Sequence, residues 1–247
     1  MTSRPNALIV GAGKAGSTSL HNYLASHPEI FGSKQKELMY FTTNHDKGLD
    51  WYHAQFPDVP GTRIWFESTP QYTFRDEFPE AAPRIHAYDP DMRLIYIVRE
   101  PISRIVSHFN HWSRVYPERY TDIEDSLARP GHRKAFVERT RYFHQISAYL
   151  DLFPAEQVQV VFMEDLRSDF VPALNRVFDF LGVAPCADTI RPKVHNKRPE
   201  REDVRVWSAA DISETRKDEL RGYLGPDVQR LLAHCGKPAD FWGAGYT

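Results

Sequence analysis

A glycine-rich turn close to the start of the chain constrains the fold more than any other stretch. Residues 7–10 form a short apolar run with β-branched side chains, which predicts a buried strand. Three glycines follow within residues 11–16, and residues 17–24 then predict a helix that opens on serine and threonine. A strand, a glycine-rich turn and a helix N-terminus together form an anion site, because backbone N–H groups point at the ligand and the helix dipole favours negative charge. Lys14 adds a full positive charge inside this loop.

Strands alternate with helices along the rest of the chain. Apolar runs predict further strands at residues 30–32, 64–67, 93–98 and 158–162. Helical spacing predicts helices at 49–56, 78–88, 102–112, 134–153, 170–181 and 213–232, with an irregular, polar stretch at 116–133. This alternation predicts an α/β fold with three layers, in which helices cover both faces of a central parallel sheet. The length favours a single domain over residues 1–247.

Composition gives no sign of a nucleic-acid or membrane partner and favours a reducing compartment. The formal net charge of -2 and the pI near 6.6 give no basic signal for nucleic acid or for a membrane surface. Residues 1–6 are too short for a signal peptide, and no apolar run approaches the roughly 20 residues of a membrane helix. With two cysteines, Cys186 and Cys235, a reducing compartment is the simpler interpretation, so we expect a cytoplasmic protein. Oligomeric state is not predicted.

Polar residues follow the ends of four predicted strands. They are Lys14, Thr69, Arg99 and Glu164. Ligands of open parallel sheets collect at the carboxyl ends of the strands. We therefore expect these side chains to line one cleft.

Two familiar phosphate loops fit the glycine turn only in part. The three glycines match the Gly-x-Gly-x-x-Gly dinucleotide pattern, which requires an acidic residue at the end of a second strand about 20 residues later. Glu29 is near that place, but no apolar run precedes it. A Walker A loop needs Gly-Lys-Ser/Thr after its last glycine, whereas Lys14 stands before Gly16. No strand ends clearly in the aspartate that would hold magnesium.

A third interpretation fits both this loop and a second motif. The loop resembles the 5′-phosphosulfate loop of sulfotransferases that use 3′-phosphoadenosine 5′-phosphosulfate (PAPS), Gly-x-x-Lys-x-Gly-Ser/Thr-Thr-x-Leu. The matching residues are Gly11, Lys14, Gly16, Ser17, Thr18 and Leu20. After the predicted strand 93–98, the chain also resembles that family's 3′-phosphate motif, Arg-Asp/Glu-Pro-x-x-Arg-x-x-Ser. Arg99, Pro101, Arg104 and Ser107 are all in register with it.

The resemblance is closest to the glycosaminoglycan and carbohydrate branch and its bacterial relatives, and it covers roughly residues 7–200. Residues 36–41 resemble the segment that carries the acceptor base, which assigns that role to Glu37. Residues 66–72 resemble a Glu-Lys-Thr-Pro-x-Tyr strand end. Ser68 stands where many members have the lysine, so a basic contact to substrate is not expected there. In other branches a histidine is the base, which makes His86 the second candidate.

The resemblance implies how PAPS is bound, without a metal. The 5′-phosphosulfate is expected on a set of residues at the first helix N-terminus: Lys14, Ala15, Gly16, Ser17, Thr18 and Ser19. Lys14 would stabilise the leaving phosphate, and adenosine 3′,5′-bisphosphate would be the product. The 3′-phosphate is expected on Arg99 and Ser107, with Lys193, Lys197 or Arg198 closing over it.

The resemblance therefore predicts transfer of sulfonate from PAPS to a hydroxyl group of a carbohydrate or a small natural-product alcohol. Two alternatives stay open: a nucleoside-triphosphate-dependent kinase, and a nucleotide-binding protein of the same fold without catalysis. Single residues also fit plainer roles. Arg99 alone is typical of a strand-end arginine paired with Glu100 or Asp91, while Glu37 and the basic run 193–201 are typical of solvated charge. The match of two motifs in the right order favours the binding roles.

Overall fold

The computed structural model describes residues 3–192 and 205–247. By its internal contacts the chain divides into two compact units, residues 1–98 with 146–196, and residues 99–145 with 197–247. The strands all belong to the first unit as far as the structure describes the chain, and the described part of the second unit is built from helices.

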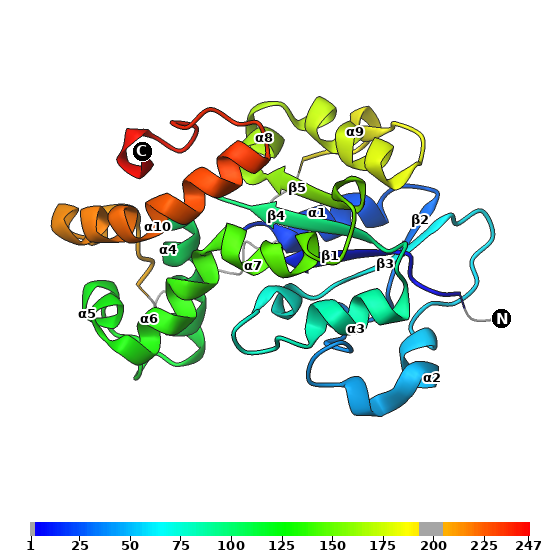
Figure 1. Ribbon diagram of the computed structural model, residues 1–247, viewed down its shortest axis with the longest axis horizontal. Helices are drawn as coiled ribbons and strands as arrows, with labels where there is room; N and C mark the ends of the chain where they lie inside the picture. The colour runs from blue at the N-terminus through cyan, green and yellow to red at the C-terminus, as the bar shows by residue number, and fades with distance from the viewer. Residues whose placement is uncertain (1–2, 193–204) are drawn as a thin grey trace. The chain divides into compact units, whose positions relative to one another are not determined.

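The first unit is built on a parallel sheet of five strands (Figure 1). In spatial order the strands are β2 (Ile30–Gly32), β3 (Ile64–Ser68), β1 (Ala7–Gly11), β4 (Arg93–Val98) and β5 (Val158–Phe162). Every neighbouring pair is parallel, and Ala7 is in register with both Phe66 and Arg93. The predicted α/β fold with a central parallel sheet is confirmed, and all five strands lie where their apolar runs predicted them.

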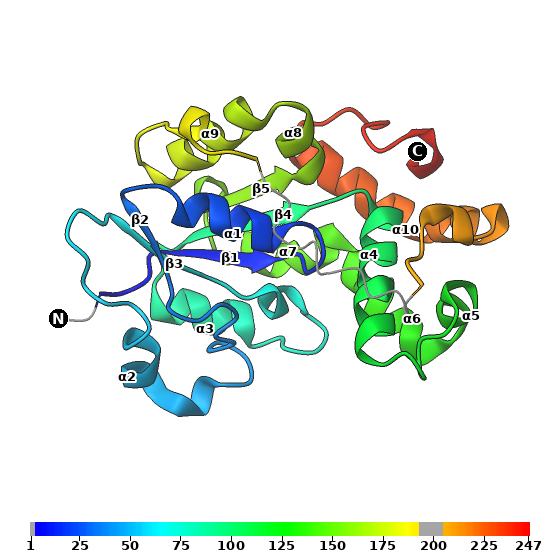
Figure 2. The ribbon, with the colours of Figure 1, turned by 180° about the vertical axis from the view of Figure 1, so that it is seen from behind.

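Helices cover both faces of this sheet (Figures 1 and 2). α1 (Ser17–Ala25) and α9 (Phe170–Leu181) share one face, where the Tyr23 ring lies 5.0 Å from that of Phe170. α3 (Ala81–Tyr88) lies on the other face, in front of the sheet in Figure 1. All five residues of β1 are buried, because a strand covered on both faces meets apolar neighbours on each side. The short helices α2 (Gly48–His53) and α8 (Met163–Ser168) also belong to this unit.

The glycine turn between β1 and α1 is fixed by its backbone. Gly16 occupies the N-cap position of α1 with φ 114°, in the left-handed region that favours glycine. An added Cβ at Gly16 would lie 2.8 Å from the sulfur of Met163. At Gly13 it would meet only Pro70, at an ordinary 3.5 Å. The turn therefore requires glycine at position 16 but not at position 13.

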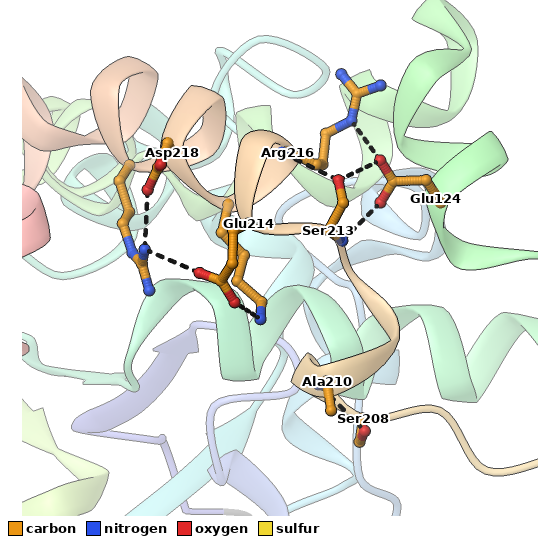
Figure 3. A network of polar contacts seen from close by, with 9 residues as sticks. Glu124, Ser208, Ala210, Ser213, Glu214, Arg216 and Asp218 are labelled. Carbon is orange, nitrogen blue, oxygen red and sulfur yellow. Dashed lines mark hydrogen bonds and ion pairs between the residues drawn. The ribbon is translucent and has the colours of Figure 1, made fainter.

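In the second unit, α10 (Glu214–His234) is capped by side chains at its start (Figure 3). The Ser213 hydroxyl accepts from the Arg216 N–H at 3.2 Å and donates to Glu124 at 2.9 Å. The backbone N–H of Ser213 donates to the same carboxylate at 3.2 Å. These contacts tie the start of α10 to α5 (Ile123–Ala128), the helix that carries Glu124.

Two predicted segments, 116–133 and 134–153, were wrong in their secondary structure. The stretch 116–133, expected to be irregular, contains α5 and the start of α6 (Pro130–Phe136). The long helix expected over 134–153 is broken: α6 ends at Phe136, a 3₁₀ turn spans Glu138–Thr140, and α7 covers only Tyr142–Leu150.

Two buried charged side chains account for this break. Arg104, on α4 (Pro101–Val115), donates to the Phe136 carbonyl and to the Thr140 hydroxyl, both at 2.9 Å. Asp227, on α10, accepts from the amides of Phe143 and His144 at 2.9 and 2.8 Å, as a cap for the start of α7. Because these partners are distant in sequence, the local periodicity did not predict where the helices end.

The two glycines of the turn give a direct test of its geometry. We expect Gly16→Ala to lower the free energy of unfolding by about 3 kcal/mol, because it combines a strained φ with a clash against Met163. Gly13→Ala is expected to cost less than about 1 kcal/mol, since its Cβ has room. Urea unfolding of both variants measures the difference, and equal losses would contradict the described turn.

Candidate functional site

The glycine turn presents the start of α1 as a set of backbone donors. Ser17, Thr18 and Ser19 are the first residues of the helix, and helix geometry leaves their N–H groups without intrahelical partners. Gly16 at the N-cap has no side chain to occupy them. Ser17 and Ser19 are buried and Thr18 is half-buried, so these donors lie in a partly desolvated setting that strengthens their attraction for an anion.

Lys14 lies within this turn, in a conformation that few residues other than glycine adopt. Its φ is 69° and its side chain is half-buried. A left-handed conformation costs a non-glycine residue roughly 1–2 kcal/mol. The turn thus holds a lysine, at a cost, directly before the N-terminus of α1.

The end of β3 lies beside the glycine turn. The Thr69 N–H donates to the Ile9 carbonyl at 3.1 Å, which joins the segment after β3 to β1. The Pro70 side chain lies next to Gly13, where it would meet an added Cβ at 3.5 Å. The structure therefore brings together two of the segments singled out in the sequence, the glycine loop and residues 66–72, at the carboxyl edge of the sheet.

The segment that carries Glu37 meets the same edge. The Glu37 N–H donates to the carbonyl of Ser68 at 3.1 Å. Glu37 and Met39 have φ values of 63° and 52°, both in the left-handed region. The Glu37 carboxylate is half-exposed and pairs with Lys36 at 2.6 Å. Glu37 thus combines a half-exposed carboxylate with a backbone that is hydrogen-bonded to the end of β3.

His21 is a residue of this edge that the sequence did not reveal. Its Nδ1 lies 2.8 Å from the Ser68 hydroxyl, and its ring packs 4.8 Å from that of Phe66. Burial, with a smaller contribution from the charge of Lys36, lowers the pKa of His21 from 6.5 to about 4. A neutral hydrogen-bonded pair therefore stands at the position where the resembling motif often has lysine. Forty-seven residues separate the partners, so no local pattern marked them.

Arg99 and Ser107 belong to the second unit, at and near the start of α4. The Arg99 carbonyl accepts from the Tyr142 hydroxyl at 2.7 Å. Glu100 caps α4, accepting from the amides of Ile102 and Ser103 at 3.0 and 2.6 Å. Within this unit the structure holds the Arg99 backbone beside a capped helix N-terminus, and it places Ser107, half-buried, on the same helix.

Other predicted residues have different outcomes. Lys193, Lys197 and Arg198 lie outside the described residues. The His86 ring packs edge-on against Phe153 at 5.1 Å, which is typical of a packing residue. Cys186 and Cys235 are free thiols. In residues 3–192 and 205–247 no three His, Cys, Asp or Glu side chains gather as a possible metal site, and no helix is long and apolar enough to cross a membrane.

Comparison with known proteins gives one consistent family. The family described as "Sulfotransferase domain" matches residues 4–200. Mouse heparan sulfate glucosamine 3-O-sulfotransferase 6 is 32% identical over 185 residues, which cover 72% of this chain and 52% of that protein. Human heparan sulfate glucosamine 3-O-sulfotransferase 3B1 is 32% identical over 186 residues, or 72% and 46% of the two chains. This chain therefore spans about half the length of the curated relatives it matches.

Solved structures agree with the sequence comparison. A sulfotransferase from Alicyclobacillus acidocaldarius superposes with a TM-score of 0.77 at 27% identity, covering 97% of this chain and 99% of that one. Mouse sulfotransferase SULT7A1 complexed with PAP has a TM-score of 0.57 at 17% identity, with coverage of 96% and 90%. The second likeness supports the fold alone.

The buried His21 should make stability depend on acid pH. Because its folded pKa of about 4 lies below the usual 6.5, the neutral ring stabilises the fold above pH 6.5, and this contribution is lost as the pH falls through 4. Between pH 7 and pH 4 we expect the wild type to lose about 3 kcal/mol more unfolding free energy than His21→Gln. Denaturant titrations at the two pH values measure the difference, and equal losses would contradict it.

Proposed function

Because the chain belongs to the sulfotransferase family, we propose that it transfers the sulfonate group of PAPS to a hydroxyl group of an acceptor. The observation that carries the proposal is the carboxyl edge of the sheet in the first unit. There the donor-rich start of α1, with Lys14 before it, lies beside the strand end that binds the Glu37 backbone. Phosphosulfate binding and proton removal are the two tasks the reaction requires.

Lys14 and the amides of the turn have the chemistry to bind the 5′-phosphosulfate. We propose that the backbone N–H groups of Gly16 and Ser19 and the hydroxyls of Ser17 and Thr18 hold its oxygens. The Ala15 N–H donates to the Ala12 carbonyl at 3.2 Å, so the contribution of Ala15 stays a prediction. During transfer a bond forms between the acceptor oxygen and sulfur, while the bond from sulfur to the 5′-phosphate oxygen breaks. Lys14 would stabilise the negative charge that develops on that phosphate. Adenosine 3′,5′-bisphosphate leaves as the product.

Glu37 is our proposed general base. Its carboxylate is half-exposed and accepts from Lys36, so it is available to solvent and to an acceptor at the edge of the sheet. In the proposed reaction it takes the proton of the acceptor hydroxyl as the oxygen attacks sulfur. As in phosphoryl transfer, most of the catalysis would come from in-line positioning and charge stabilisation. The residues assigned to this step require no metal.

Arg99 and Ser107 are proposed to bind the 3′-phosphate. A guanidinium presents a planar fork of donors that matches phosphate geometry. Contributions of Lys193, Lys197 and Arg198 stay predictions, as does the assignment of residues 1–247 to a single sulfotransferase domain. A cytoplasmic location and the absence of a nucleic-acid or membrane partner also stay predictions.

The acceptor is proposed to be a carbohydrate or a small-molecule alcohol. The curated relatives are named for heparan sulfate glucosamine, which supports a sugar hydroxyl as the first class to test. The alternatives are a kinase and a non-catalytic nucleotide-binding protein. Family membership favours sulfonate transfer over phosphoryl transfer, and the joint presence of Lys14 and Glu37 favours catalysis over binding alone.

Transfer of labelled sulfonate tests the reaction. Incubated with PAPS labelled on sulfur and a panel of sugar and small-molecule alcohols, the wild type is expected to label at least one acceptor. Lys14→Ala should lower the turnover by about 10²- to 10³-fold, because one charge donor to the leaving group is lost. Lys34→Ala is the matched control, since Lys34 is an exposed lysine bonded to the Ala54 carbonyl. Magnesium-dependent ATP turnover without sulfonate transfer would favour the kinase.

Nucleotide binding tests the 3′-phosphate residues separately. Arg99→Ala is expected to weaken binding of adenosine 3′,5′-bisphosphate by roughly 10- to 100-fold, the usual loss for a charge-assisted hydrogen bond. Arg63→Ala, which removes an exposed arginine paired with Glu29, should leave the affinity unchanged. Calorimetric titration gives both constants, and an unaltered affinity in Arg99→Ala would remove Arg99 from the site.

A further inference from the structure

A buried carboxylate lies behind the segment that carries Glu37. Glu67, on β3, is 0% exposed. Its Oε1 accepts from the hydroxyls of Tyr52 and Tyr72 at 2.9 and 2.6 Å, and its Oε2 accepts from the Thr69 hydroxyl at 2.7 Å. A backbone hydrogen bond from Leu38 adds a fourth donor. Four donors match the lone pairs that two carboxylate oxygens offer, so the buried charge is fully satisfied.

The hydroxyls around Glu67 also accept hydrogen bonds from the same segment. The five consecutive amides of residues 37–41 all donate to the strand end or to groups bonded there. The Glu37 N–H donates to the Ser68 carbonyl at 3.1 Å, and the Leu38 N–H donates to Glu67. The Met39 N–H donates to the Thr69 hydroxyl at 3.2 Å. The N–H groups of Tyr40 and Phe41 both donate to the Tyr72 hydroxyl, at 3.0 and 3.4 Å. Four of these amides therefore reach the Glu67 carboxylate directly or through one hydroxyl.

The direction of these hydrogen bonds depends on an acceptor at position 67. Tyr72 and Thr69 each give their one hydroxyl proton to Glu67, which leaves their lone pairs free to accept backbone amides. Burial raises the pKa of the Glu67 carboxyl, and the bonds from Tyr72, Thr69 and Tyr52 act in the opposite direction by favouring the ionised form. A glutamine would place two donors where only acceptors fit, and it would disturb the orientation of both hydroxyls.

The segment needs such anchoring because its backbone is strained. Glu37 and Met39 have left-handed φ values of 63° and 52°, each of which costs a non-glycine residue roughly 1–2 kcal/mol. Stacking of Tyr40 on Tyr52, with ring centroids 4.2 Å apart, adds an apolar contact. The hydrogen bonds to the strand end are the main directional interactions that offset the strain.

We propose that Glu67 is a positioning residue, whose buried carboxylate fixes the backbone of residues 37–41 and thereby the place of the Glu37 carboxylate. Its role in catalysis rests on the proposed function, in which Glu37 is the base. Glu67 itself is buried and would not touch substrate. Displacing a catalytic group by about 1 Å can lower the rate on the order of 10²-fold, so we expect the loss of this positioning to lower kcat by up to about that factor.

Glu67→Gln tests the proposal with two readouts. We expect kcat to fall by roughly 10- to 100-fold while the KM for PAPS changes less than about twofold, because the glycine turn keeps its own contacts. Amide hydrogen exchange within residues 37–41 should become at least about tenfold faster, as their shared acceptor is lost. The matched control is Asp227→Asn, which alters another buried carboxylate that binds two backbone amides, in the second unit. It should reduce stability without changing the exchange of residues 37–41.

A second pair of variants covers the case in which Glu67→Gln does not fold. Tyr72→Phe removes the hydroxyl that accepts from Tyr40 and Phe41, and it should lower kcat and speed exchange at those two amides. Tyr52→Phe removes a hydroxyl that donates to Glu67 but accepts neither of these two amides. It should leave kcat within about threefold of the wild type.

The outcomes separate the anchoring from the proposed reaction. Unchanged exchange at residues 37–41 in both Glu67→Gln and Tyr72→Phe would overturn the anchoring, whatever the activity. Faster exchange with wild-type kcat would overturn the positioning of the base. Faster exchange with a lower kcat and a constant KM for PAPS supports both. A wild type that labels no acceptor would count against the proposed function, while exchange would still decide the anchoring.

Discussion

Parallel pairing of β1 with β3 is the constraint on which the candidate site depends. Because the strands run in the same direction, the segments that follow them emerge at the same edge of the sheet. The glycine turn follows β1, and the Glu37 backbone binds to Ser68 at the end of β3, just before the segment that follows this strand. An antiparallel pairing would send them to opposite edges. The site in this unit is therefore a consequence of sheet topology, and its chemistry comes from side chains that this topology brings together.

Buried charged groups then fix the segments that the sheet alone leaves undefined. In the first unit Glu67 holds residues 37–41, and in the second unit Arg104 and Asp227 set the ends of α6 and α7. Each binds backbone groups that lack partners in regular secondary structure. A buried charge is stable only when its hydrogen bonds are complete, so each of these side chains admits few backbone arrangements around it. These side chains fix the backbone in parts of the chain where helices and strands end.

The departure from the family pattern at Ser68 has a local physical explanation. Ser68 is buried and its hydroxyl meets His21, whose pKa is lowered by burial so that the ring is neutral at pH 7. Serine and a neutral imidazole fill this space without adding charge beside the Lys36–Glu37 pair. Two residues that are far apart in sequence thus form one polar contact in space.

The sequence by itself determined the α/β fold, the five strands and the glycine turn. These depend on apolar runs and on motifs of a few adjacent residues, which local composition encodes. Only the tertiary structure decided the break between α6 and α7, the capping role of Asp227, the pairing of His21 with Ser68 and the role of Glu67. Each of these depends on one polar side chain that meets a partner distant in the chain. A single buried polar residue produces no periodic pattern in the sequence. Its structural role can therefore be identified only from the partners that it contacts in the folded chain.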